Sequence, residues 1–152
     1  MDIEFRWTNG SDEAFHDFYL KTEDFYSSIV GGRKNREAFI PYNISESISD
    51  VLIAEIDGKA VGCGGLKMYS MNAIEIKRLW VNMEYRGKHI ASEIMERLEE
   101  RAEREGYTRL ILQTRPQMEG AISLYTKRGY KKIDNYPPYD KLEGAICFEK
   151  CI

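Results

Sequence analysis

The stretch IEIKRLWVNMEYRGKHIA, residues 74–91, decides the fold class, because it passes from a strand through a basic turn into a helix. Ile74 and Ile76 alternate with charged residues before the run becomes wholly apolar, which is typical of a strand entering a core. A turn containing Gly87 follows, and apolar residues then recur at helical spacing until Gly106. The stretch therefore predicts a strand, a tight turn and a helix N-terminus in succession.

A helix N-terminus that follows a basic, glycine-containing turn is suited to binding phosphate. It offers unpaired backbone N–H groups and a partial positive charge. Arg86 and Lys88 add full charges, and Gly87 lacks a Cβ, so the backbone can approach a ligand closely. Because basic turns before helices are common, an ordinary structural turn remains an equal alternative when this feature is taken alone.

The rest of the chain predicts a mixed α/β domain. Asp57-Gly58 indicates a hairpin that pairs two antiparallel strands. The element order predicts a mainly antiparallel sheet, then a strand-helix-strand crossover, and finally a helix and a terminal hairpin. The predicted strands are 3–7, 51–56, 60–69, 73–81, 110–112, 130–133 and 145–148, and the predicted helices run from about 11 to 30, from about 90 to 106 and from 121 to 127.

Aromatic residues recur at helical spacing in the first predicted helix and form one face. Core packing and an aromatic wall for a substrate both account for this face, and core packing is favoured. The basic loop 31–36 follows, which either contacts an anionic ligand or is simply solvated. The residues of the face are Phe15, Phe18, Tyr19, Phe25, Tyr26 and Ile29.

Composition narrows the function classes. A chain of 152 residues fits one domain, 1–152, and its net charge of −3 argues against bulk nucleic-acid binding. The acidic N-terminus does not resemble a signal peptide, and no apolar run is long enough to span a bilayer. Cys63, Cys147 and Cys151 lack metal-type spacing with the histidines, so we expect a cytoplasmic protein without a disulfide framework or metal site.

Two motifs together resemble the GNAT family of N-acetyltransferases. The turn RGKHIA fits the family pattern R/Q-x-x-G-x-G/A from Arg86 to Ala91, with His89 where the family usually has glycine. The segment AISLYTKRGY, 121–130, is similar to the family's A-x-x-L-Y-x-x-x-G-F/Y motif. Met118 stands where several members have asparagine or glutamine, and Gln117 is one place off. The resemblance covers roughly residues 51–148.

The resemblance implies a fold and a cofactor. The fold is a mixed, mostly antiparallel sheet that splays between its fourth and fifth strands and is flanked by helices. The cofactor is acetyl-coenzyme A, whose pantetheine arm would pair with the exposed strand edge and whose pyrophosphate would bind the basic turn. The implied cofactor-binding residues are Leu79, Trp80, Val81, Arg86, Gly87, Lys88, His89, Ile90, Ala91 and Ser92.

The resemblance also implies transfer of an acetyl group to a primary amine by direct attack. An amine with a pKa near ~10.4 must lose a proton before it attacks, and Glu75 is the implied base, acting through a water. Alternatively, Glu75 is a surface carboxylate paired with Lys77 or Lys67. Tyr125 is the implied acid for the leaving thiolate, or else a buried aromatic with a satisfied hydroxyl.

The acceptor is less well defined by the sequence. Tyr26, Tyr136, Tyr139 and Asp140 are candidate acceptor contacts, the last three because the family's C-terminal loop helps to wall the acceptor site. Cys63 lies in a glycine-rich strand and is better read as a buried structural thiol than as an acyl carrier. The identity of the amine and homodimerisation stay open.

Two alternatives to an enzyme also remain. A regulatory module would bind acyl-coenzyme A without useful catalysis, which the departures at His89 and Met118 make worth testing. A protein-binding domain would use the aromatic face of the first helix and would gain no stability from coenzyme A, since only a ligand of the native state raises its stability.

Overall fold

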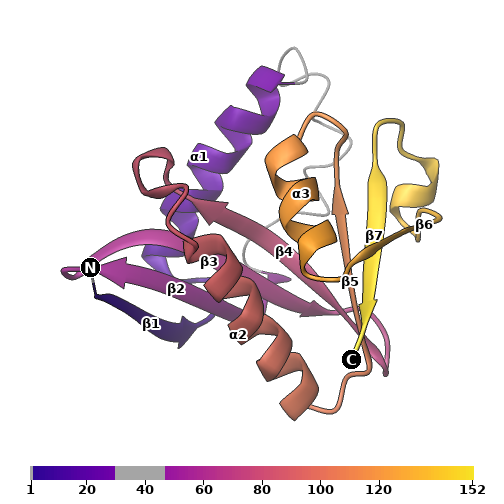
Figure 1. The fold of residues 1–152 in the computed structure, drawn as a ribbon, viewed down its shortest axis with the longest axis horizontal. Coiled ribbons are helices and arrows are strands. Elements are labelled where there is room, and N and C mark those ends of the chain that lie inside the picture. The colour runs from indigo at the N-terminus through magenta and orange to yellow at the C-terminus, as the bar shows by residue number, and fades with distance from the viewer. Residues whose placement is uncertain (1, 30–46) are drawn as a thin grey trace.

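The computed structural model describes residues 2–29 and 47–152, and these residues form a seven-stranded sheet flanked by helices (Figure 1). The predicted loop 31–36 and the end of the first helix at Val30 lie outside the described residues. In chain order the elements are β1 (Ile3–Thr8), α1 (Glu13–Ile29), β2 (Asp50–Ile56), β3 (Lys59–Met68), β4 (Ala73–Val81), the 3-10 helix η4 (Met83–Tyr85), α2 (Ile90–Arg104), β5 (Arg109–Thr114), α3 (Glu119–Lys127), β6 (Lys131–Ile133), the 3-10 helix η5 (Tyr139–Lys141) and β7 (Ile146–Cys151).

The sheet is mixed and mostly antiparallel, as the sequence predicted. Its strand order is β1-β2-β3-β4-β5-β7-β6. β4 and β5 pair in parallel, because α2 crosses over between them, and the other neighbouring strands pair antiparallel. The predicted hairpin at Asp57-Gly58 joins β2 to β3.

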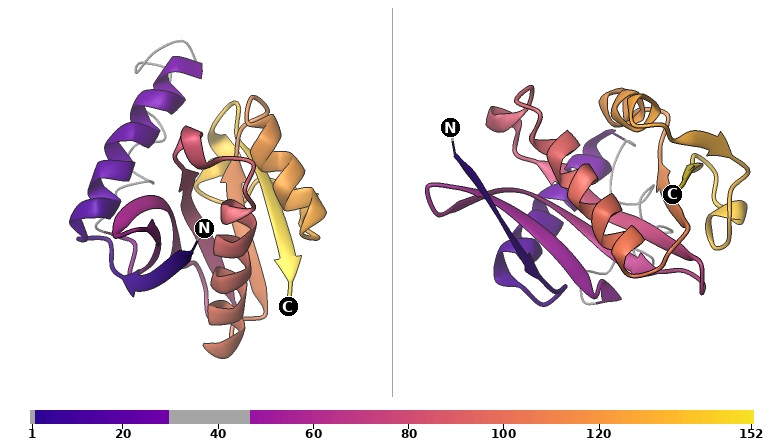
Figure 2. Two further views of the ribbon diagram at one scale, coloured as in Figure 1. Left: turned by 60° about the vertical axis from the view of Figure 1, so that its left-hand side comes forward. Right: turned by 60° about the horizontal axis from the view of Figure 1, so that its bottom comes forward.

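Helices cover both faces of the sheet, so its central strands β2 to β5 are mostly buried (Figure 2). Alternate residues of β2 show the division, because Leu52 packs in the cluster that contains α2, whereas Ile53 packs in the cluster that contains α1. Phe15 and Phe18 anchor α1 in the second cluster. The core prediction for this part of the aromatic face is therefore confirmed.

β4 and β5 separate soon after they begin to run side by side. Their pairing extends from Ala73 opposite Arg109 to Glu75 opposite Ile111. Beyond that point β4 stays with β3 and β5 stays with β7, so the two strands diverge (Figure 1). The predicted splay between the fourth and fifth strands is present, and it leaves an opening in the middle of the sheet.

A β-bulge distorts β4 beside this opening. Lys77 lies opposite Gly65 and Trp80 lies opposite Cys63, so two residues of β4 face one residue of β3. Arg78, within the bulge, has a left-handed backbone with a φ of 60°. A left-handed conformation is costly for a residue with a side chain, so the bulge has to be held by its surroundings.

Side chains from β3 and α1 hold the bulge. The Cys63 thiol donates a hydrogen bond to the Arg78 carbonyl over 3.3 Å. The Arg78 guanidinium lies 3.0 Å from the Glu23 carboxylate of α1, and its central carbon lies 4.2 Å from the centre of the Tyr19 ring. Since both charged side chains are buried, a buried ion pair joins α1 to the bulge.

The described residues were compared with the geometry of membrane-spanning helices, metal sites and disulfide bonds. Within 2–29 and 47–152, no helix is both long and apolar enough to cross a bilayer. In the same residues, no cluster of three or more His, Cys, Asp or Glu side chains has the geometry to hold a metal ion. Cys63, Cys147 and Cys151 are free thiols.

Candidate functional site

Two adjoining cavities occupy the opening between β4 and β5. The larger, of about 370 Å3, lies between the end of β4, the basic turn, the start of α2 and α3, and we call it the turn cavity. The smaller, of about 80 Å3, lies between β4, β5, α1 and α3, and we call it the strand cavity. Leu79, Met118 and Ala121 line both cavities, so a ligand in one can meet a ligand in the other.

The turn cavity brings together the residues predicted to bind the cofactor. Leu79, Trp80 and Val81 line it from β4, and the turn and the start of α2 supply most of the others. Lys88 is the exception, because its ammonium points to the Tyr85 ring, 5.7 Å from the ring centre, and the residue is exposed. The remaining lining residues from the prediction are Arg86, Gly87, His89, Ile90, Ala91 and Ser92.

The backbone of the turn explains why glycine is usual at the position of His89. His89 directly precedes α2 and has a φ of 63°, in the left-handed region that favours glycine. Gly87 also has a positive φ, of 78°. His89 therefore adopts a backbone conformation that glycine would adopt without strain.

The Arg86 side chain makes contacts within the protein. Its Nε donates a hydrogen bond to the Val81 carbonyl over 2.9 Å, and its guanidinium carbon lies 4.8 Å from the centre of the Trp80 ring. These contacts tie the basic turn to the end of β4. The side chain remains exposed and lines the turn cavity, so its charge still faces that cavity.

A further group of basic residues adjoins the turn cavity, and the sequence reasoning missed it. A third cavity, of about 560 Å3, is lined by Lys127, Arg128 and Lys150 together with His89 and Ser92. The Arg128 guanidinium is held by Glu99 at 2.6 Å and donates to the Ser92 hydroxyl over 3.3 Å. The adjacent basic residues Lys127 and Arg128 in the segment 121–130 were the sequence feature that could have indicated this group.

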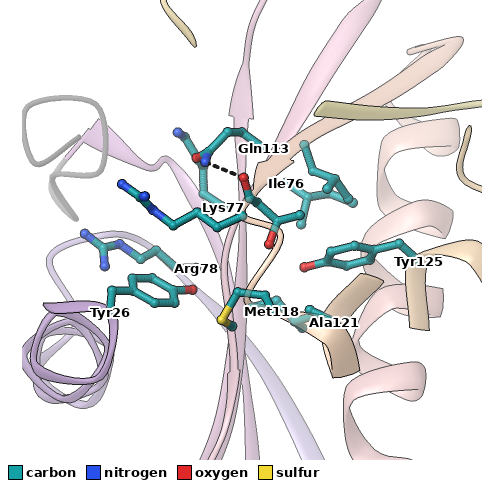
Figure 3. A pocket seen from close by; sticks show the side chains of 12 residues that line it. Tyr26, Ile76, Lys77, Arg78, Gln113, Met118, Ala121 and Tyr125 are labelled. Atoms are coloured by element: carbon teal, nitrogen blue, oxygen red, sulfur yellow. Dashed lines mark hydrogen bonds between the residues drawn. The ribbon is translucent and has the colours of Figure 1, made fainter. Parts of the chain in front are cut away.

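Two tyrosines face each other across the strand cavity (Figure 3). Tyr26 from α1 and Tyr125 from α3 direct their hydroxyl groups into it from opposite sides. The Tyr125 ring is buried against Tyr130 and Phe148. Burial, and to a smaller extent the neighbouring Tyr26, raises the pKa of Tyr125, so its phenol stays protonated at neutral pH.

Glu75 is buried behind the strand cavity and does not line it. Its Oε2 accepts a hydrogen bond from the Tyr136 hydroxyl over 2.7 Å, and its Oε1 lies 3.4 Å from the Lys77 ammonium. Lys77 does line the cavity, and it donates a hydrogen bond to the Tyr139 hydroxyl. Burial lowers the pKa of Lys77 to about 8, although Glu75 acts in the opposite direction.

Of the four residues predicted to contact the acceptor, one lines the strand cavity and three do not. Tyr26 lines the strand cavity. Tyr136 and Tyr139 are buried in a cluster with Ile111 and do not line it, and their hydroxyl groups instead contact Glu75 and Lys77. Asp140 is exposed and does not line the strand cavity.

Cys63 is placed as a structural thiol. Its side chain is buried in the cluster beneath α1 and lines neither the turn cavity nor the strand cavity. Burial raises the pKa of the thiol, which keeps it protonated and therefore a poor nucleophile.

Comparison with known proteins agrees with this geometry. The model of the Acetyltransferase (GNAT) family matches residues 12–130. The chain belongs to the GNAT family. This GNAT protein is 33% identical over 100 residues to the IAA acetyltransferase of Azospirillum brasilense, and the match covers 65% of each chain. The chain spans less than two thirds of the length of this and the other curated relatives that it matches.

Solved structures share the fold of this GNAT protein over almost its whole length. A crystal structure from Klebsiella pneumoniae subsp. pneumoniae MGH 78578 superposes with a TM-score of 0.83 at 21% identity, covering 98% of this chain and 97% of that chain. The PaiA N-acetyltransferase of Thermoplasma acidophilum, solved in complex with coenzyme A, superposes with a TM-score of 0.76 at 22% identity and full coverage of both chains. These likenesses show the acyl-CoA N-acyltransferase fold.

Proposed function

We propose that the protein transfers an acetyl group from acetyl-coenzyme A to a primary amine by direct attack. The observation that carries the proposal is the meeting of the turn cavity and the strand cavity at Leu79, Met118 and Ala121. A donor thioester reaching that junction from the turn cavity would meet an amine entering from the strand cavity. Membership of the GNAT family and the coenzyme A bound to the Thermoplasma relative support this assignment.

The donor would lie along the turn cavity. Its pantetheine arm would follow β4 past Glu75, where β4 and β5 no longer pair, and backbone N–H groups near Leu79 and Val81 would polarise the thioester carbonyl. Its pyrophosphate would bind the N-terminus of α2. Lys127 and Arg128 line the third cavity, which shares His89 and Ser92 with the turn cavity, and they would add positive charge for the cofactor's phosphates.

Proton transfer would involve the buried network behind the strand cavity. The amine must lose a proton before its nitrogen attacks the thioester carbon. Glu75 is the proposed base, and Lys77 stands between its carboxylate and the cavity, so the proton path passes along Lys77 or a water beside it. Tyr136 and Tyr139 are positioning residues, since their hydroxyl groups contact these two side chains.

Tyr125 would serve the leaving group. As the carbon–sulfur bond breaks, the sulfur of coenzyme A takes up negative charge and needs a proton. The protonated Tyr125 hydroxyl faces the strand cavity beside Ala121, at the junction with the turn cavity. Donation of its proton to the thiolate would release coenzyme A, and the nitrogen of the adduct would lose its second proton to solvent, from which the Tyr125 phenolate regains one, leaving the acetylated amine.

The test combines turnover with cofactor binding. Glu75→Gln and Tyr125→Phe should each lower kcat by roughly 10²-fold or more, the usual contribution of general acid–base groups, while calorimetry finds coenzyme A affinity little changed. Tyr107→Phe, which removes a phenol outside both cavities, is the matched control. Wild-type rates in both site variants would remove the acid–base assignment.

A binding module without catalysis is the second candidate, and the burial of Glu75 away from the strand cavity favours it. The two candidates differ in turnover alone. Thiol release from acetyl-coenzyme A with any member of a broad amine panel supports the enzyme. Tight binding of coenzyme A with no thiol release across that panel supports the module.

A further inference from the structure

The strand cavity has a distinctive charge that bears on the identity of the acceptor. Lys77 and Arg78 line it from β4, and Arg115 lines it just after β5. Each of the three residues is more than nine-tenths buried, with exposed fractions of 5%, 7% and 8%. Among the described residues that line the cavity, no aspartate or glutamate is present. The described wall thus contains cationic residues from β4 and from the position after β5, and no carboxylate residue.

The carboxylates that stabilise Lys77 and Arg78 lie outside the cavity lining. Glu75 contacts Lys77 and Glu23 contacts Arg78, but neither carboxylate lines the cavity. Arginine stays charged at any physiological pH, and the pKa of Lys77, about 8, keeps it mostly protonated at neutral pH. The neutral lining groups add hydrogen-bond donors, namely the hydroxyls of Tyr26 and Tyr125 and the amide of Gln113.

We propose that the acceptor is a small amine that also carries a carboxylate, such as an α-amino acid, and that Arg115 binds this carboxylate. The inference rests on the proposed acetyl transfer and names its substrate class. A guanidinium binds a carboxylate through two parallel hydrogen bonds, and a site that excludes water strengthens such charge-assisted bonds. The volume of about 80 Å3 has room for a small molecule.

The same charges select against acceptors that carry several amines. A second ammonium group, as in a polyamine, would lie among the like charges of buried cations. The cationic wall also favours the neutral form of the reacting amine, because nearby positive charge lowers the pKa of an ammonium group. An α-amino acid places its carboxylate one carbon from its amine, which suits a small cavity that is lined both by Arg115 and by Leu79 at the junction.

The first experiment compares matched acceptors with the wild-type protein. Thiol release from acetyl-coenzyme A is measured with alanine and alaninamide, then with other amino acids and their amides, and with spermidine. The proposal expects kcat/KM to be at least 10-fold higher for the acids than for their amides, and spermidine to be a poor substrate. Equal or better turnover of the amides or of spermidine would overturn the proposal while leaving acetyl transfer itself established.

The second experiment assigns the carboxylate to its cation. Arg115→Met should lower kcat/KM for the preferred amino acid by 10-fold or more and leave the value for its amide unchanged. Arg104→Met, at an exposed position in the last turn of α2, is the control and should change neither. An equal loss for acid and amide would mean that Arg115 is structural and would contradict its part in the proposal.

Calorimetry separates this proposal from the proposed function. The same amino acids and amides are titrated into the wild-type protein saturated with coenzyme A. Binding of the acids in preference to the amides supports the carboxylate site even if no thiol is released, in which case only the catalytic assignment fails. Preferential binding of amides or polyamines overturns the carboxylate site even if turnover is observed.

Discussion

Neutralising Glu23 should destabilise the protein far more than neutralising a surface carboxylate. The Glu23 and Arg78 side chains are 7% and 3% exposed, and their charged atoms lie 3.0 Å apart. At an effective dielectric constant near 20, two unit charges at that separation attract by roughly 5 kcal/mol. Glu23→Gln removes this attraction and leaves the Arg78 charge buried, and breaking a buried pair in this way costs about 3–5 kcal/mol.

The measurement is urea-induced unfolding, supported by thermal unfolding. A loss of about 3–5 kcal/mol corresponds to a fall in Tm of about 6–20 °C for a chain of this size. Glu93→Gln is the matched control, because Glu93 pairs with Arg97 at 3.5 Å on the surface of α2, where both side chains are more than 40% exposed. That substitution should cost less than ~1 kcal/mol.

A comparable loss for the two variants would refute the reasoning, because it would mean that the buried pair behaves like a surface pair. A functional readout accompanies the stability measurement. Since Arg78 belongs to the bulge next to Leu79, Glu23→Gln should also weaken coenzyme A binding in calorimetry, and Glu93→Gln should not. Combining Glu23→Leu with Arg78→Met removes both charges and should restore much of the lost stability.

Two further predictions concern Lys77 and His89. The pKa of Lys77 is about 8 in the folded protein and 10.5 in the unfolded chain, so the unfolded chain binds more protons between these pH values. The free energy of unfolding should therefore rise by about 3 kcal/mol as the pH increases across that window. Urea titrations at several pH values should show this rise in the wild-type protein and not in Lys77→Met. His89→Gly should be about 1 kcal/mol more stable than His89→Ala, because glycine adopts the φ of 63° without the strain that alanine would incur. Equal midpoints of urea unfolding for the two variants would contradict the strain assigned to the turn.

The sequence predicted the fold well because local patterns and the fold agree. The alternation before Val81, the hairpin at Asp57-Gly58 and the helical spacing after Gly87 each specify an element that the structure contains. The strand ends moved by a few residues, as at β7, which runs to Cys151 instead of ending at Phe148. Strand ends depend on pairing partners distant in the chain, so a local pattern fixes them poorly.

The site was only partly predictable, for three physical reasons. The bulge at Arg78 shifts the alternation of β4, and no residue pattern marked it. The contact from Tyr136 to Glu75 joins residues 61 positions apart, so a local reading could not place Glu75 behind the cavity. Arg115 and Lys77 line the same cavity because β4 and β5 diverge, and this divergence could not be located from a local pattern.

The short pairing of β4 with β5 divides the sheet into two parts, which we call leaves, and the paired segment that joins them is the spine. One leaf holds β1 to β4 and the other holds β5 to β7, and the strand pairing between them runs from Ala73 to Glu75 on the β4 side, next to a hydrogen bond from the Thr108 N–H to the Asn72 carbonyl. A ligand arm bonded along β4 and packed against α3 would bridge the leaves beyond the spine. Amide hydrogen exchange in β4 after Glu75 should therefore slow when coenzyme A binds, whereas β2, deep within one leaf, should be little affected.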